Sequence, residues 1–100
     1  KKDRRLYSKG FMLDEESREV EYEGVPLRLT RTEYAILKEL IIKDGSTITK
    51  SALLERISYD TPDCTENSLK QHVSNLRKKI EGVASSDRIE SVWGVGFRLI

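Results

Sequence analysis

The sequence predicts an α+β domain in which an amino-terminal antiparallel sheet precedes three helices and a carboxy-terminal β-hairpin. Three observations predict this class. Apolar and polar residues alternate between residues 11 and 29, which is the period of half-buried strands. Helix-start signals follow at Thr30 and Thr49, and between residues 65 and 80 apolar residues recur every three or four positions. Two short apolar runs then flank Gly94-Val95-Gly96.

Composition sets the broad limits. A chain of 100 residues with 37% hydrophobic and 35% charged residues predicts one compact, soluble domain. No apolar run approaches the roughly 20 residues that span a bilayer, and no secretory signal follows the basic amino end. Cys64 is the single cysteine, which excludes an internal disulfide and is compatible with a reducing compartment. We expect a cytoplasmic protein with no membrane partner.

The net charge of +1 hides an uneven distribution. Residues 14–23 hold six acids and one arginine, whereas residues 66–80 hold four basic residues and one acid. A local basic face attracts phosphates more effectively than the overall sum suggests. The acidic stretch is interpreted as the exposed side of a sheet, without a partner.

The amino-terminal part predicts three strands. Residues 1–9 are basic and without a clear period, so we expect a frayed end or the remnant of a linker, and a domain that spans 10–100. Glu23-Gly24 has hairpin spacing, and Gly24 tolerates a positive φ. The residues expected to face inward are Phe11, Leu13, Val20, Tyr22, Val25, Leu27 and Leu29.

Two helices follow. Thr30 and Glu33 form a capping box, and the helix that they open should end near Gly45. A second helix starts at Thr49 and runs to about Ile57, with Ile48 and Leu53 spaced as a hydrophobic staple. Residues 58–64 then predict an exposed loop with room for a partner. The first helix should bury Tyr34, Leu37, Leu40 and Ile41.

The third helix, Thr65 to Ile80, is amphipathic. Its apolar stripe is formed by Leu69, Val73, Leu76 and Ile80. Roughly 160° away from that stripe point Asn67, Gln71, Ser74 and Lys78, flanked by Lys70 and Arg77 on one side and Lys79 on the other. Such a face suits a DNA major groove, with amides at base edges and cations at phosphates. An ordinary solvated face has the same pattern, and the helix alone leaves both readings open.

The carboxy-terminal part predicts a loop after Gly82, over residues 83–88. Two strands, Ile89–Trp93 and Phe97–Ile100, then surround Gly94-Val95-Gly96. A hairpin directly after a recognition helix is a wing.

The residue inventory gives no support to catalysis or to a cofactor. His72 is the single histidine, and one histidine with one cysteine falls short of the three or four ligands of a tetrahedral metal site. Gly94-Val95-Gly96 lacks the Gly-Lys-Ser/Thr ending of a phosphate loop. No nucleophile, base and orienting group can be identified. We therefore expect no enzyme activity, no metal and no cofactor.

Three motifs, in this order, resemble a known family. Leu-Thr-Arg-Thr-Glu-Tyr at 29–34, Leu-Arg-Lys-Lys-Ile at 76–80 and Val-Trp-Gly-Val-Gly-Phe-Arg-Leu at 92–99 look like the DNA-binding effector domain of OmpR/PhoB-type response regulators. The resemblance covers nearly the whole chain from Phe11 to Ile100. It implies a winged helix-turn-helix fold and sequence-specific binding of double-stranded DNA.

The resemblance also implies roles for individual residues. The third helix of the family enters the major groove, the wing approaches the adjacent minor groove, and the loop before the third helix contacts RNA polymerase in activators. The DNA-binding candidates are thus Asn67, Lys70, Gln71, Ser74, Asn75, Arg77, Lys78, Ser91 and Trp93. The candidates for the polymerase-contacting loop are Ser58, Tyr59, Asp60, Thr61 and Asp63.

This sequence departs from the family pattern at the wing and on the third helix. Trp93 stands where the family usually has an arginine, a residue favoured in narrow minor grooves. The indole has two alternatives, packing against sugars and the groove wall or folding back onto the core. Ser74 and Asn75 are neutral where many relatives carry arginine, so base reading would rely more on amides.

The family further implies an upstream receiver domain that a sensor kinase phosphorylates. Relatives bind direct repeats as head-to-tail dimers, so the isolated domain is expected to be mostly monomeric in solution and dimeric on DNA. The alternative is a winged helix used for protein contacts, which docks through residues 58–64 or through the sheet and does not read bases.

Overall fold

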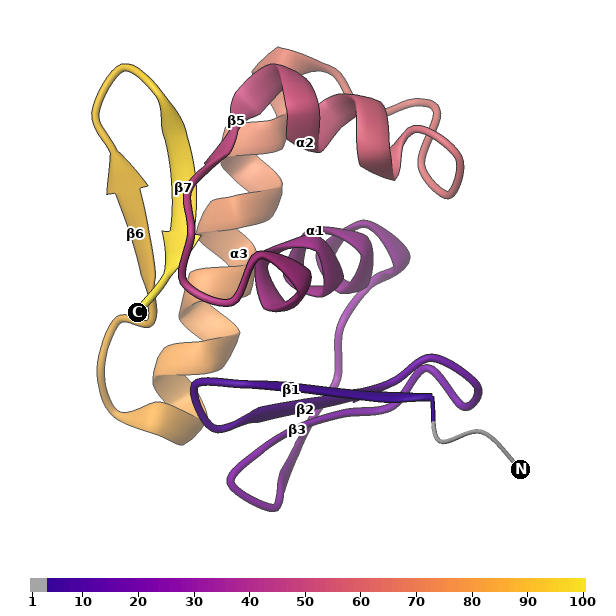
Figure 1. Cartoon of the computed structure of the whole chain (residues 1–100), viewed down its shortest axis with the longest axis vertical. Helices are drawn as coiled ribbons and strands as arrows, with labels where there is room; N and C mark the ends of the chain where they lie inside the picture. Colours follow the sequence, from indigo (N-terminus) through magenta and orange to yellow (C-terminus); the bar gives the residue numbers. More distant parts are fainter. Residues whose placement is uncertain (1–3) are drawn as a thin grey trace.

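The computed structural model describes residues 4–100, which form two sheets and three helices (Figure 1). The helices α1 and α3 lie between a four-stranded sheet at one end of the molecule and α2 at the other, and a three-stranded sheet runs along α3. The elements are, in order, β1 (Arg5–Ser8), β2 (Phe11–Asp14), β3 (Val20–Tyr22), β4 (Val25–Leu27), α1 (Arg31–Lys43), β5 (Ile48–Thr49), α2 (Lys50–Ile57), α3 (Glu66–Ala84), β6 (Ile89–Val92) and β7 (Gly96–Leu99).

The amino-terminal sheet is antiparallel in the order β1-β2-β3-β4. Glu23 and Gly24 have φ values of 47° and 85°, which gives the predicted two-residue hairpin. The prediction of a frayed end or linker over residues 1–9 is wrong for Arg5–Ser8, because β1 pairs with β2 along its whole length. Residues 1–3 lie outside the described residues. Lys9 and Gly10, with φ values of 52° and 90°, form the hairpin that makes β1 possible.

The predicted edge strand is less buried than its alternation indicates. Val25 is 46% exposed, and β4 ends at Leu27, two residues before Leu29. Pro26 lies within β4, where an edge strand tolerates the missing N–H. The well-buried part of this sheet is therefore β2 and β3, whose Phe11 and Tyr22 rings lie 4.8 Å apart.

Helix α1 begins as predicted. The Glu33 amide donates to Thr30 Oγ1 at 3.2 Å, and the Thr30 amide donates to Glu33 Oε1 at 2.9 Å, which completes the capping box. The helix ends at Lys43, and Asp44 with φ 48° is its left-handed cap, one residue before the predicted Gly45. The predicted inward residues are all buried, namely Tyr34, Leu37, Leu40 and Ile41.

Helix α2 also begins as predicted, since Thr49 Oγ1 accepts the Ala52 amide at 3.1 Å. Ile48 and Leu53 are both buried. Residues 58–64 form the predicted loop, in which Asp60 and Cys64 are half-buried and one residue is buried. Thr61 is buried, and its hydroxyl donates to the Ile57 carbonyl at 3.0 Å, so this residue holds the loop to α2.

Helix α3 is longer than predicted. It starts after the Thr65 cap, but it continues past Ile80 and Gly82 to Ala84, so the predicted loop over 83–88 is wrong for its first two residues. Gly82 is exposed, whereas Val83 and Ala84 pack against the core and extend the buried face by another turn. Ser85, with φ 58°, caps the helix. No helix within residues 4–100 is long and apolar enough to cross a membrane.

The carboxy-terminal hairpin forms as predicted, with Trp93 in its turn rather than at the end of a strand. A second strand that the sequence does not predict, β5, pairs with β7 and converts the hairpin into a sheet of order β5-β7-β6. This pairing requires glycine at position 96, because a Cβ there would lie 1.9 Å from the Ile48 carbonyl oxygen. The four-stranded sheet, three helices and wing confirm the predicted α+β architecture.

Candidate nucleic-acid interface

The outer face of α3 is polar over most of its length. Its stripe of Leu69, Val73, Leu76 and Ile80 is buried, as the periodicity predicts. On the other side, Gln71 Nε2 donates to Asn75 Oδ1 at 3.0 Å, which orients two amides along the helix. The exposed candidates on α3 are Asn67, Lys70, Gln71 and Lys78, and the half-buried ones are Ser74, Asn75 and Arg77.

The turn of the wing and the amino end of α3 lie at the same end of the molecule, away from β1–β4 (Figure 1). Trp93 in that turn is 96% exposed, so its indole does not fold back onto the core. The turn is held by two backbone bonds. The Val95 amide donates to the Val92 carbonyl at 2.9 Å, and the Lys50 amide donates to the Val95 carbonyl at 3.3 Å.

A groove of about 480 Å³ separates α3 from the wing. Three cationic side chains line it, Lys50 from α2, Lys70 and Arg77 from α3, and its wing side includes Ser91 and Trp93. Among the described residues, no carboxylate lines this groove. A concave surface with charges of one sign concentrates the field that attracts phosphates.

The periodicity predicts that Arg77 extends freely from α3, but its side chain is bonded to β6. Its Nε donates to the Ile89 carbonyl at 3.2 Å, and its Nη2 donates to Ser91 Oγ at 2.6 Å. Asp87 Oδ1 lies 3.7 Å from the same Nε. Two candidate residues, Arg77 and Ser91, are therefore bonded to each other. The sequence offers no signal for this contact, because it joins a helix to a strand across a loop.

Lys79, the cation expected on the other flank, is also engaged within the fold. Its Nζ lies 2.6 Å from Glu33 Oε1, and the Glu33 side chain is only 3% exposed. This ion pair ties α3 to the first turn of α1. Lys79 is not among the cations that line the groove.

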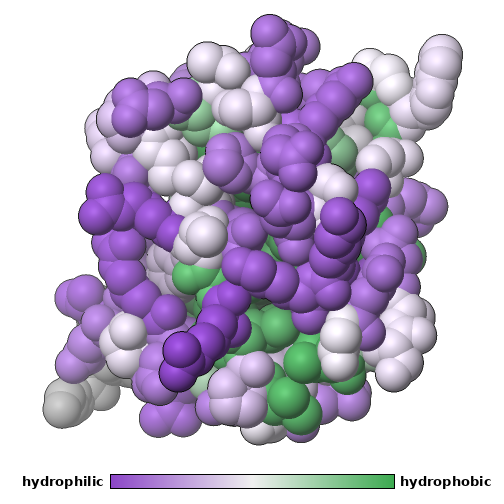
Figure 2. Space-filling view, turned by 180° about the vertical axis from the view of Figure 1, so that it is seen from behind, coloured by the Kyte–Doolittle hydropathy of each residue, from purple (hydrophilic) through white to green (hydrophobic). Residues whose placement is uncertain are grey.

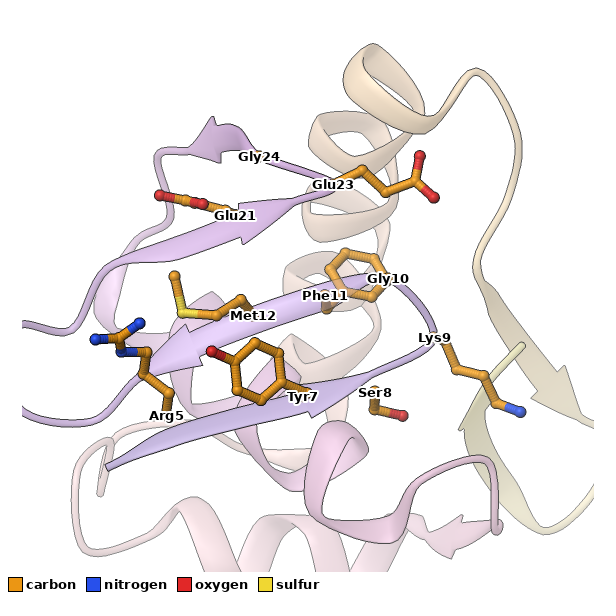
Figure 3. A pocket seen from close by; sticks show the side chains of 10 residues that line it. All are labelled: Arg5, Tyr7, Ser8, Lys9, Gly10, Phe11, Met12, Glu21, Glu23 and Gly24. Carbon is orange, nitrogen blue, oxygen red and sulfur yellow. The ribbon is translucent and has the colours of Figure 1, made fainter. Parts of the chain in front are cut away.

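Two other concave surfaces lie away from the wing groove. One, of about 460 Å³, borders the loop before α3 and is lined by Asp60, Asp63 and His72, among others. The other, of about 470 Å³, is a hollow on the outer face of β1–β3, where Arg5, Tyr7, Met12 and Glu21 stand on one side of the sheet (Figure 3). Among residues 4–100, no group of three or more potential ligands is placed to hold a metal ion.

The loop candidates differ in exposure. Tyr59 is 93% exposed, and Ser58 and Asp63 are also exposed. Asp60 is half-buried and lies 3.9 Å from Arg18 Nη2, across from the acidic turn of the sheet.

Seen from behind, hydrophilic residues dominate the upper part of the molecule, and hydrophobic ones gather in the lower part, towards β1–β4 (Figure 2).

Comparison with known families identifies the domain. The family model described as "Transcriptional regulatory protein, C terminal" matches residues 24–99, which include all three helices and the wing. The chain belongs to this family. The predicted resemblance to the effector domains of OmpR/PhoB-type response regulators is thereby confirmed.

Curated relatives share this domain as one part of a longer protein. The transcriptional regulatory protein BaeR of Escherichia coli O6:H1 is 32% identical over 89 residues, which cover 88% of this chain and 37% of BaeR. The response regulator MprA of Mycolicibacterium vanbaalenii is 38% identical over 88 residues, which cover 87% of this chain and 38% of MprA. The chain thus spans less than two-fifths of the length of these relatives.

A solved structure agrees with the fold. The DNA-binding domain of the response regulator AdeR, crystallised in complex with an intercistronic region, superposes with a TM-score of 0.80 at 30% identity. The match covers 94% of this chain and 96% of the AdeR domain. The winged helix-turn-helix fold is therefore confirmed.

Proposed function

We propose that this domain binds double-stranded DNA in a sequence-specific manner, as the effector domain of a two-component response regulator. The observation that carries the proposal is the shared placement of the α3 polar face and the wing turn on either side of a groove lined by cations. Amides on a helix suit base edges in the major groove, and flanking cations suit phosphates. The AdeR domain bound to an intercistronic region supports the same use of the fold.

Within this proposal the candidate residues have distinct roles. Asn67, Gln71, Ser74 and Asn75 read base edges, and Lys70 and Lys78 contact phosphates. Trp93 contacts sugars or the wall of the adjacent minor groove, because its exposed indole has no core to pack on. The Ser91 hydroxyl accepts from Arg77, so we assign it to supporting the wing rather than to reading bases.

The remaining parts of the proposal concern the whole protein. We expect a cytoplasmic regulator without enzyme activity, whose receiver domain is phosphorylated by a sensor kinase and whose effector domains bind direct repeats head to tail. The loop that contains Ser58, Tyr59, Asp60, Thr61 and Asp63 is the proposed contact with RNA polymerase. The 93% exposure of Tyr59 supports this role, since exposed aromatic residues serve as anchors in protein interfaces.

The test is an amide NMR titration of the domain with a mixed-sequence DNA duplex at two salt concentrations. We expect shifts at residues 67–79 and 91–96, including the Trp93 indole, and weaker binding at the higher salt concentration. The control is a titration with buffer of the same ionic strength and no DNA. If the duplex perturbs no resonance at low salt, DNA is not the ligand, and the alternative of a protein-interaction module docked through the 58–64 loop takes its place.

A further inference from the structure

The side chain of Arg77 hydrogen-bonds α3 to the wing. Among residues 4–100, both hydrogen bonds between α3 and β6 come from Arg77, through Nε to the Ile89 carbonyl and through Nη2 to Ser91 Oγ. The two acceptors, the Ile89 carbonyl and the Ser91 hydroxyl, belong to residues two positions apart on the same strand. A planar guanidinium presents its donors in a rigid fork that can reach two such acceptors at once.

The start of the wing is fastened by the same group of residues. Asp87 Oδ1 accepts the Ile89 amide at 3.2 Å and lies 3.7 Å from Arg77 Nε. Ile89 is fully buried, and its backbone bonds Asp87 through the N–H and Arg77 through the carbonyl. The Arg77 side chain is 28% exposed and its bond to the Ile89 carbonyl is partly buried, whereas Asp87 is 52% exposed and the bond to Ser91 is exposed. Hydrogen bonds from a charged donor are stronger than those between neutral groups, and the partly buried one is less screened by solvent.

We infer that Arg77 is a positioning residue, which fixes the wing to α3 and thereby sets where Trp93 meets DNA. This inference rests on the proposed function, and it assigns Arg77 a different role from the phosphate contact that the sequence predicts. A duplex that binds α3 in its major groove reaches Trp93 only if the wing keeps its angle to that helix. Substituting Arg77 should therefore remove the wing's contribution to DNA binding and leave the contribution of α3.

The first measurement is made on the free domain. Backbone order parameters of residues 91–95 should fall in Arg77→Gln, and also in Arg77→Lys, because a lysine cannot bond both acceptors in one geometry. Arg56→Gln is the matched control, since it removes the same charge from an ion pair with Glu39 on the other side of the fold. Unchanged order in both Arg77 variants would overturn the inference, whatever the domain binds.

The second measurement is a double-mutant cycle with Trp93→Ala, using a duplex selected from random sequence for binding to the wild type. We expect Arg77→Gln to weaken binding about tenfold alone and little further in the Trp93→Ala background. Ser91→Ala should act in the same direction by a smaller factor, since it removes one bond. The slope of log K against log salt should not change.

If Arg77 contacts a DNA phosphate instead, the cycle gives a different result. Arg77→Gln would then cost the same factor with and without Trp93, and the salt slope would fall by about 0.9. That result overturns the inference while leaving the proposed function intact. If the wild-type domain binds no duplex, the proposed function fails, and the order parameters of the free domain still decide whether Arg77 fixes the wing.

Discussion

At the scale of single residues, Gly96 is the position where the wing has no room for a side chain. A Cβ would meet the Ile48 carbonyl oxygen at 1.9 Å, and this neighbour is backbone that cannot rotate away. We expect Gly96→Ala to lower the free energy of unfolding by about 3 kcal/mol, at the upper end of the cost of overpacking. Urea unfolding measures the loss.

Gly82 provides the control for that substitution. It lies inside α3, and a Cβ there would meet nothing within 4 Å. Gly82→Ala should raise the free energy of unfolding by about 1 kcal/mol, because alanine is the better helix former. Equal effects of the two substitutions would show that close approach to β5 is not what position 96 requires.

In the proposed function Gln71 and Asn75 read bases, and their side-chain amides are hydrogen-bonded to each other. Replacing either by alanine should cost a selected site about 1 to 3 kcal/mol of binding free energy and leave random DNA nearly unaffected. The double variant should cost less than the sum, because each amide orients the other. Binding curves on selected and random duplexes test this, and equal losses on both would contradict a base-reading role.

Periodicity predicts which residues face outward on α3, but not what those residues touch. Gln71 follows from spacing alone, because a helix fixes the directions of its own side chains, whereas Asn75 is predicted only through the family resemblance. The contacts of Arg77 and Lys79 depend on β6 and α1, which the chain brings alongside α3 only after folding. That is why both cations seemed available to phosphates in the sequence and are engaged within the fold.

At the scale of elements, the turn after β2 is stabilised by a carboxylate whose contribution depends on pH. The backbone amides of Ser17 and Glu16 donate to the Asp14 carboxylate and hold its pKa below the ordinary value of 3.8. A depressed folded-state pKa adds stability that is present above the unfolded pKa and is lost as the pH falls through the folded one.

Asp14→Asn should remove this dependence. We expect the wild type to be the more stable protein above about pH 4, and the difference to shrink as the pH falls further. Urea midpoints of both proteins across the acid range provide the measurement. A difference that stays constant down to the lowest pH would indicate that the charge of Asp14 does not contribute.

Elements were predictable where their signals are local. The caps at Thr30 and Thr49 lie next to the helices that they open, and the sequence predicts both of them. The strand β5 has only two residues, too few to show a period, and it exists because β7 lies beside it. Similarly, β1 has only Leu6 and Ser8 turned inward, and its pairing depends on the Lys9-Gly10 turn.

At the scale of the whole molecule, a net charge of +1 gives little long-range attraction to DNA. The salt dependence of DNA binding should therefore be set by the phosphate contacts made at the groove. Replacing Lys70 by glutamine should lower the magnitude of the slope of log K against log salt by about 0.9. Lys38→Gln is the matched control, because Lys38 pairs with Glu15 at 3.5 Å near the amino-terminal sheet. Equal slopes in the two variants would remove Lys70 from the phosphate contacts.

The pairing of β5 with β7 has a consequence for how the domain folds. Ile48 pairs with Phe97, so nearly half of the chain must be ordered before the middle strand of the wing has neighbours on both sides. Closing so long a loop costs entropy before its contacts repay it, whereas the helices form from contacts close in sequence. The wing should therefore be completed late in folding, after the helices. A partly folded domain would expose a formed α3 without the wing that restricts how DNA approaches it.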